Sequence, residues 1–185
     1  MMREIRIHAR AGQGAITTAM LLATAAFEEG KYALAFPHFG AERMGAPMNA
    51  FVRLSDVPIR LRSQIRHPDY VLVQDPTLLR VNDVTAGLKP GAIVIVNEER
   101  SPEELGLKAR VVTVPASCIA RDVIGRADRG NTALLGAFAA ATGEISLEAL
   151  KKAVSARFQG ESRDRNLEAL EQAYDLIASK PGGSS

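Results

Sequence analysis

The residues best suited to chemistry lie at a short turn near the amino terminus. Gly12 and Gly14 bracket Gln13, Arg10 precedes the glycines, and Thr17 follows them. If a helix starts at this turn, its first backbone N–H groups have no partner inside the helix and carry roughly half a positive charge. Such groups suit a phosphate or another anion, and the guanidinium of Arg10 and the hydroxyl of Thr17 add donors. The turn is therefore predicted to bind an anion. In the alternative interpretation its glycines only supply unusual dihedral angles.

The turn matches no known nucleotide-binding motif, and the rest of the sequence shows no catalytic centre. A dinucleotide fingerprint reads G-x-G-x-x-G and a P-loop ends in G-K-[ST], and the turn fits neither pattern. The sequence shows no Ser–His–Asp ordering, no paired carboxylates and no metal-ligand spacing, so we expect no catalytic residue and no metal site. Cys118 is the only cysteine, which excludes a disulfide within the chain and a cysteine-ligated iron–sulfur cluster carried by this chain alone. We interpret Cys118 as a small buried core residue.

The turn lies between a predicted strand and a predicted helix. Charged and apolar residues alternate from Glu4 to His8 with the period of two that is typical of a strand. A strand, a glycine-containing turn and a long amphipathic helix make the first half of a βαβ unit. The apolar face of this helix is predicted to contain Ile16, Met20, Ala23 and Phe27, widened by Ala19, Leu22 and Ala26.

Strand and helix signals alternate along the rest of the chain. Further strands are predicted at residues 31–36, where Pro37 ends the strand, and at 48–55, 69–75, 92–97 and 110–114. Asp75 is expected to cap a short helix that starts at Pro76. From Pro115 on, the pattern is helical, and Gly136 is expected to allow close helix packing. Capping residues predict helix starts at Ser101, Ser146 and Ser162.

These signals predict an α/β fold: a Rossmann-like three-layer domain with a largely parallel sheet and a helical carboxyl-terminal third. We expect one domain over residues 1–180 and a disordered tail at 181–185. Of the 185 residues 46% are hydrophobic and 24% charged, which is ordinary for a globular protein with a core. A net charge of +2 and 5% aromatic residues do not favour nucleic acid as a partner, and no apolar run approaches the roughly 20 residues of a membrane span. No secretory signal is recognised, so we expect a cytoplasmic location.

The segment from Pro37 to Pro47 is long for a connection inside a compact domain and shows neither the helix period nor the strand period. Loops of this kind tend to be functional, although a flexible connector is the simpler alternative. The apolar residues in this loop are expected to be buried, either under the loop or against a partner chain. We therefore predict a subunit interface at five residues: Phe39, Gly40, Glu42, Arg43 and Met44.

Three motifs resemble a known family in the same order along the chain. Residues 5–14, IRIHARAGQG, are similar to its opening strand and G-x-G-G-Q-G turn. Residues 36–56 contain FGAERMGAP and are similar to its F-G-x-E-R-x-G-x-P loop and the strand that follows. Residues 131–138, NTALLGAF, are similar to its N-x-x-x-L-G-A-F helix. The family is that of the gamma subunits of thiamine-diphosphate-dependent 2-oxoacid:acceptor oxidoreductases, such as pyruvate:ferredoxin oxidoreductase. Ala9 and Ala11 depart from the pattern, because the family usually has glycine there.

The resemblance implies that the chain acts only inside a larger complex and is not catalytic alone. Thiamine-diphosphate-binding and ferredoxin-like subunits would carry thiamine diphosphate and the iron–sulfur clusters. The complex would convert pyruvate or a related, branched or aryl 2-oxoacid and coenzyme A into acyl-CoA and CO2, and would pass two electrons to ferredoxin or another acceptor. The gamma subunit would help to bind coenzyme A. On this resemblance, the predicted contacts are Arg10, Gly12, Gln13, Gly14 and Thr17.

Two other functions stay open at this point. The chain could be a purely structural subunit that supports its complex without touching a ligand. It could also be a free-standing nucleotide-binding α/β protein built on the same turn. The loop around Phe39 favours a partner chain over the free-standing protein.

Overall fold

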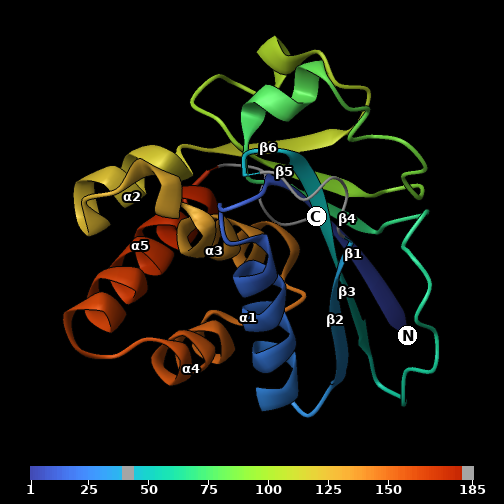
Figure 1. Cartoon of the computed structure of the whole chain (residues 1–185), viewed down its shortest axis with the longest axis horizontal. Coiled ribbons are helices and arrows are strands. Elements are labelled where there is room, and N and C mark those ends of the chain that lie inside the picture. The colour runs from blue at the N-terminus through green and yellow to red at the C-terminus, as the bar shows by residue number, and fades with distance from the viewer. Residues whose placement is uncertain (39–43, 181–185) are drawn as a thin grey trace.

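The computed structural model describes residues 1–38 and 44–180, which form a six-stranded sheet with helices against it (Figure 1). Its strand order is β2-β3-β1-β4-β5-β6. The strands are β1 (Met2–Arg10), β2 (Tyr32–His38), β3 (Pro47–Ser55), β4 (Tyr70–Val73), β5 (Ile93–Asn97) and β6 (Arg110–Val114). In this described sheet β3 alone runs against the other strands, because it pairs antiparallel with both neighbours while the remaining pairs are parallel. The predicted α/β fold with a largely parallel sheet is confirmed. The tail predicted at 181–185 lies outside the described residues.

The described part of the chain forms five α-helices: α1 (Ala15–Glu28), α2 (Ala116–Ile124), α3 (Asn131–Thr142), α4 (Leu147–Arg157) and α5 (Gly160–Ala178). Figure 1 shows α1, α3, α4 and α5 on one side of the sheet. Alternate side chains of the strands point to that side, so that Ile7 of β1, Leu72 of β4 and Ile95 of β5 are fully buried in one core with these helices. The helical carboxyl-terminal third is confirmed. Of the residues that the structure describes, no helix has the length and apolar character that a membrane crossing requires.

The opposite face of β4 and β5 is covered by short segments instead of long helices. Val71 and Val94 belong to a second, smaller core that also includes Leu79 and Leu105. The short 3-10 helices of the chain are η1 (Pro76–Arg80), η2 (Glu103–Leu105) and η3 (Ala127–Arg129). The helix predicted to start at Ser101 is therefore only a single turn, because the chain leaves the helical conformation at Gly106.

Helix α3 lies at the centre of the helical layer and is buried almost all round. A Cβ atom placed on Gly136 would lie 2.1 Å from the backbone oxygen of Leu170, so only glycine lets α5 approach this closely. The hydroxyl of Thr132 donates to Asn166 of α5 at 3.0 Å. The prediction that Gly136 allows close packing is confirmed.

Several predicted boundaries are tested by this structure. Asp75 caps η1 by accepting from the backbone N–H of Thr77 at 2.9 Å, and Ser146 caps α4, both as predicted. The prediction that Pro37 ends the second strand is wrong, because β2 continues to His38. Proline is tolerated there since β2 is an edge strand and its missing N–H costs no ladder hydrogen bond. Ser162 caps no helix, because α5 already starts at Gly160.

Helix α1 buries only part of its predicted apolar face. Leu22 and the alanines beside it are buried, but Ile16, Met20 and Phe27 are 39%, 55% and 75% exposed. The buried residues are Ala15, Thr18, Ala19, Leu21, Leu22, Ala25 and Ala26. Small side chains allow α1 to lie close to the sheet, and the larger residues consequently lie on its outer face. The expectation that Ile16, Met20 and Phe27 belong to the core face is wrong.

Candidate anion-binding site

The strand–turn–helix predicted at the amino terminus is present. β1 ends at Arg10, α1 begins at Ala15, and Gly12 and Gly14 adopt positive φ angles of 96° and 77°. Glycine is favoured at both positions because other L-residues rarely adopt this conformation. Within residues 1–38 and 44–180 no side chain caps α1, and its first turn contains no acidic residue. The helix start therefore keeps its partial positive charge.

One side of the turn is a closed hydrogen-bond network around Asp75. The amide of Gln13 donates to the Asp75 carboxylate at 2.7 Å and accepts from the backbone N–H of Arg10 at 2.8 Å. The guanidinium of Arg10 donates to Thr77 at 2.8 Å and to the backbone oxygen of Gly45 at 3.1 Å, and its Nε lies 3.3 Å from Asp75. Burial opposes ionisation of Asp75, but hydrogen bonds from Thr77 and Gln13 and the charge of Arg10 keep the pKa of its carboxyl below the usual value. The charge of Arg10 is thus balanced within the turn.

The turn is also fixed to the carboxyl ends of β4 and β5. Thr18 donates to the side-chain oxygen of Gln74 at 3.0 Å, and the Gln74 amide donates to the backbone oxygen of Gln13 at 2.9 Å. Asn97 donates to the backbone oxygen of Gln74 at 2.9 Å and accepts from the backbone N–H of Ser117 at the start of α2. These contacts hold the turn rigidly against the sheet.

Residues 44–47, the described end of the predicted interface segment, meet the turn from the other direction. The backbone N–H of Ala11 donates to the oxygen of Ala46 at 2.9 Å, and that of Gly45 donates to the oxygen of Ala11 at 3.1 Å. Met44 is 87% exposed, and its sulfur lies 2.6 Å from the position of a Cβ atom on Gly12. The turn and this end of the segment are therefore adjacent. Four of the predicted interface residues lie outside the described residues: Phe39, Gly40, Glu42 and Arg43.

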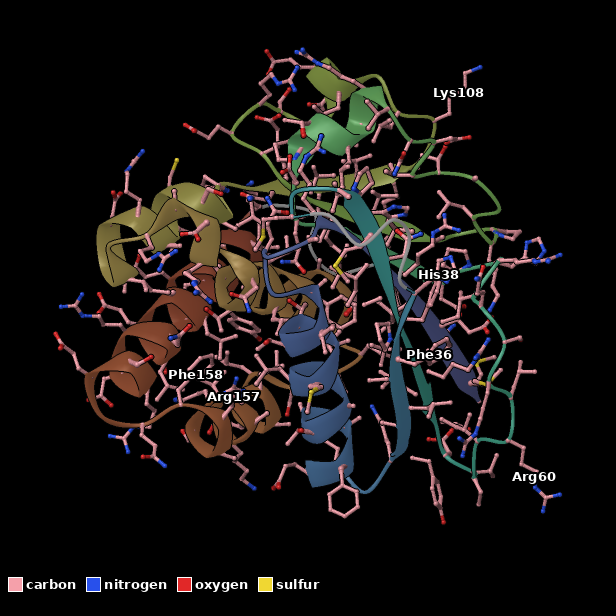
Figure 2. All side chains as sticks on the ribbon, viewed as in Figure 1. Phe36, His38, Arg60, Lys108, Arg157 and Phe158 are labelled. Carbon is pink, nitrogen blue, oxygen red and sulfur yellow. The ribbon has the colours of Figure 1, made fainter. Side chains whose placement is uncertain are left out.

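A pocket of about 360 Å³ opens on the side of the turn away from this network of partners, where α1, α3 and α5 begin. We call it the arginine pocket. In the described part of the chain its lining contains no acidic residue: Gly14, Thr17, Ile124, Arg126, Arg129, Asn131, Arg157, Phe158, Ser162 and Asn166. Figure 2 shows Arg157 and Phe158 next to each other between α5 and α1, and the Arg157 guanidinium lies 5.4 Å from the centre of the Phe158 ring. Three cationic side chains and three helix starts make this pocket suited to anions.

The arginines of the pocket differ in how they are paired. Arg126 forms an ion pair with Asp128 at 2.7 Å, and both side chains are about half exposed. Arg129 has no ion pair with any residue that the structure describes, and Arg157 has only its contact with Phe158. Two of the three positive charges in the pocket are therefore unbalanced.

Asn131 lies between the turn and the pocket. It is the first residue of α3 and only 7% exposed, and its amide nitrogen lies 3.5 Å from the position of a Cβ atom on Gly14. Its side-chain amide forms no hydrogen bond with the described residues. It also lines a small polar cavity of about 20 Å³, shared with Gln74 and Asn97, which has room for one water molecule. Because this amide has no partner among the described residues and lies at the wall of a pocket, its donor and acceptor are available to a ligand.

Of the predicted binding residues, the structure brings only Gly14 and Thr17 to the arginine pocket. Arg10 and Gln13 lie in the Asp75 network, and Gly12 lies under Met44. The three arginines were missed from the sequence because Arg126 and Arg129, at the two ends of η3, lie far along the chain from Arg157 at the end of α4, and only the fold brings them together. Asn131 could have been found from the sequence, since it is the first residue of the NTALLGAF motif. Cys118 is partly exposed and donates to Glu99 at 3.0 Å, which raises the pKa of the thiol, so its interpretation as a buried core residue is wrong.

The fold and the pocket define an α/β protein with a positively charged pocket at the starts of its helices. Residues 4–176 match the family model described as pyruvate ferredoxin/flavodoxin oxidoreductase. Pyruvate synthase subunit PorC of Methanosarcina barkeri is 54% identical over 178 residues, which cover 95% of this chain and 97% of that protein. The common subunit gamma of the pyruvate/ketoisovalerate oxidoreductases of Thermococcus kodakarensis is 50% identical, with 94% and 96% covered.

A solved structure agrees with these matches. The crystal structure of pyruvate oxidoreductase subunit PORC from Thermotoga maritima is similar with a TM-score of 0.84 and 39% identity, covering 94% of this chain and 96% of that one. The chain belongs to the pyruvate ferredoxin/flavodoxin oxidoreductase family. The resemblance to gamma subunits of this family, stated from three motifs, is confirmed.

Proposed function

We propose that this chain is the gamma subunit of a multisubunit 2-oxoacid:acceptor oxidoreductase. The complex oxidatively decarboxylates pyruvate or a related 2-oxoacid to acyl-CoA in the cytoplasm and passes electrons to ferredoxin or another acceptor. The names of the relatives, which match over nearly their whole length, support this proposal. Thiamine-diphosphate-binding and ferredoxin-like subunits carry thiamine diphosphate and the iron–sulfur clusters, since one cysteine cannot hold a cluster.

We further propose that the chain contacts coenzyme A, and the observation that carries this proposal is the arginine pocket. Coenzyme A has a diphosphate and a 3′-phosphate, so its nucleotide end is strongly anionic. Arg129 and Arg157 form no ion pair with the described residues, so their guanidinium groups can bind phosphates. Hydrogen bonds between charged groups are about twice as strong as those between neutral groups. Thr17 supplies a hydroxyl, and Asn131 supplies the amide that lacks a partner among the described residues.

The predicted binding residues take two roles in this proposal. Gly14 and Thr17 face the phosphates directly, because they line the pocket. Arg10 and Gln13 keep the turn in shape through Asp75, and Gly12 leaves room for Met44. The pocket is at the lower end of the roughly 300–1,000 Å³ typical of ligand sites. It therefore receives the phosphate-bearing end of coenzyme A, and the remainder extends toward a neighbouring subunit.

The test replaces two arginines in the assembled complex. The double variant Arg129→Ala/Arg157→Ala should raise the apparent KM for coenzyme A by roughly 10- to 100-fold, the range for lost hydrogen bonds to charged groups. The KM for the 2-oxoacid should stay the same, because that substrate reacts on thiamine diphosphate in another subunit. Arg60→Ala is the matched control, since Figure 2 shows Arg60 on a different side of the molecule from Arg157.

Two outcomes contradict parts of the proposal. An intact double variant with an unchanged KM for coenzyme A would make the chain a structural subunit without ligand contact. If the chain from its native host were recovered as a monomer that binds a nucleotide alone, it would be a free-standing protein instead of a subunit.

A further inference from the structure

A row of apolar residues runs along the outer face of α1, next to the exposed Thr24. We call Ile16, Met20, Ala23 and Phe27 the α1 stripe; their spacing of four, three and four residues places them on one line along the helix. Ile16, Met20 and Phe27 are 39%, 55% and 75% exposed, and Ala23 is half-buried. No charged residue occurs from Ala15 to Phe27. A surface helix normally carries charged and polar residues on its outward face, so this face is unusual for a helix in water.

The surroundings of the stripe concentrate charge at its two ends. At the end of α1, Glu28 lies 3.8 Å from Lys152 of α4, and Glu29 accepts from the backbone N–H of Ser146 at 2.7 Å. At the start of α1, Thr17 borders the arginine pocket. Figure 1 shows α1 beside β2 on one flank and α4 on the other. The stripe is therefore an uncharged seam between two charged ends.

We propose that the α1 stripe is a docking seam for an apolar helix of a larger subunit of the same oxidoreductase. A spacing of three and four residues is the spacing of helices that cross at about 20° with interdigitating side chains. A helix with charged residues at its ends and apolar residues between them would match the charge distribution along α1. This inference rests on membership of a family of enzyme subunits and is independent of contact with coenzyme A.

The exposed area favours a larger subunit over a second copy of this chain. Phe27, Met20 and Ile16 together expose on the order of 300 Å² of apolar surface, given roughly 150–250 Å² for a whole aromatic side chain. A stable pairwise interface buries about 800 Å² on each partner. The stripe alone is thus too small to hold two copies together, whereas a subunit that contacts this chain elsewhere as well can use it as one part of a larger interface.

The experiment co-expresses the chain with the other subunits of its complex and measures assembly by size exclusion and native mass spectrometry. Met20→Lys/Phe27→Lys places two charges in the seam and should weaken assembly by about tenfold. Val81→Lys is the matched control, because Val81 is an apolar residue with 62% exposure on another element, and this variant should assemble normally. The isolated double variant should melt within about 2 °C of the wild type, since both replaced side chains are exposed.

The proposal is overturned if the double variant assembles like the wild type. It is also overturned if the isolated wild-type chain forms a dimer that the double variant abolishes, because the occupant would then be a second copy. Phe27→Ser tests the seam without adding charge and should weaken assembly by a smaller factor. The KM for coenzyme A in whatever complex forms should stay unchanged, which separates this proposal from that of ligand contact.

Discussion

The two sides of the turn at the start of α1 differ in how their polar groups are satisfied. On the Asp75 side, Arg10 and Gln13 use their donors on neighbours within the chain. On the pocket side, Arg129 forms no ion pair with any described residue, and the side-chain amide of Asn131 forms no hydrogen bond with any of them. The same turn therefore has a structural side, which fixes its conformation, and an open side, where charge and donors remain for a ligand.

The largest expected effect is on the structural side. Asp75→Ala removes the partner of Arg10 and Gln13 and the cap of η1. We expect a loss of about 3 kcal/mol in the free energy of unfolding, because a cap contributes about 1 kcal/mol and a partly buried charge loses its counter-charge. Urea denaturation of the isolated chain measures it. A loss within about 0.5 kcal/mol would show that this network does not hold the turn.

The next effect concerns His8, a buried side chain that lacks a hydrogen-bond partner among the described residues but does not line the arginine pocket. On the other face of the sheet, His8 is 4% exposed, and its Nδ1 has no hydrogen-bond partner in the part of the chain that the structure describes. Burial, and then the charge of Arg6, lower the pKa of His8 to about 4. An unfolded histidine has a pKa near 6.5, so the unfolded chain binds more protons between pH 4 and 6.5, and the folded state loses stability as the pH falls through this window.

Stability should fall by about 1.5 kcal/mol from pH 6.5 to pH 5 through His8, and His8→Phe should remove this part of the pH dependence. Urea denaturation at several pH values measures it, and the KM for coenzyme A of the complex should not change. If His8→Phe left the pH dependence as it was, His8 would not be held neutral by burial.

The smallest effects come from a matched pair of amides. Gln13→Ala should lower stability by about 1–2 kcal/mol, because it breaks the bonds to Arg10 and Asp75. Asn131→Ala should change stability by less than about 0.5 kcal/mol, because its amide has no partner among the described residues, but it should raise the KM for coenzyme A several-fold. Denaturation and steady-state kinetics of the two variants give both readouts. If Asn131→Ala lowered stability and Gln13→Ala raised the KM for coenzyme A, the Asp75 side of the turn would be the ligand side and the pocket side would be structural.

Local signals in the sequence were enough for much of the fold. The alternation from Glu4 to His8, the glycines of the turn and the cap at Ser146 act over a few residues, and each predicts its element correctly. The sequence could not decide which face of α1 is buried, because two rows of apolar residues have helical spacing. One row contains Ile16, Met20 and Phe27, and the other contains Leu22 and the buried alanines. Only tertiary packing decides which row is buried.

The candidate site was predictable only in part. Gly14 and Thr17 follow from the turn itself, but Arg126, Arg129 and Arg157 reach the same pocket through the packing of α2, α3, α4 and α5. Arg126 and Arg129 are close in the sequence, at the two ends of η3, but nothing in the sequence links them to Arg157 or to the turn. The balance of charge between Arg10 and Asp75 was likewise hidden, because the two residues are far apart in the sequence and meet only where β1 and β4 lie side by side.

The most direct test of contact with coenzyme A is a structure of the assembled complex with coenzyme A bound. We predict that a phosphate group of coenzyme A lies within hydrogen-bonding distance of Arg129 and Asn131, at the start of α1 beside Gly14 and Thr17. If every phosphate of coenzyme A is held by other subunits, with none within reach of a residue of this chain, the arginine pocket is not the coenzyme A site.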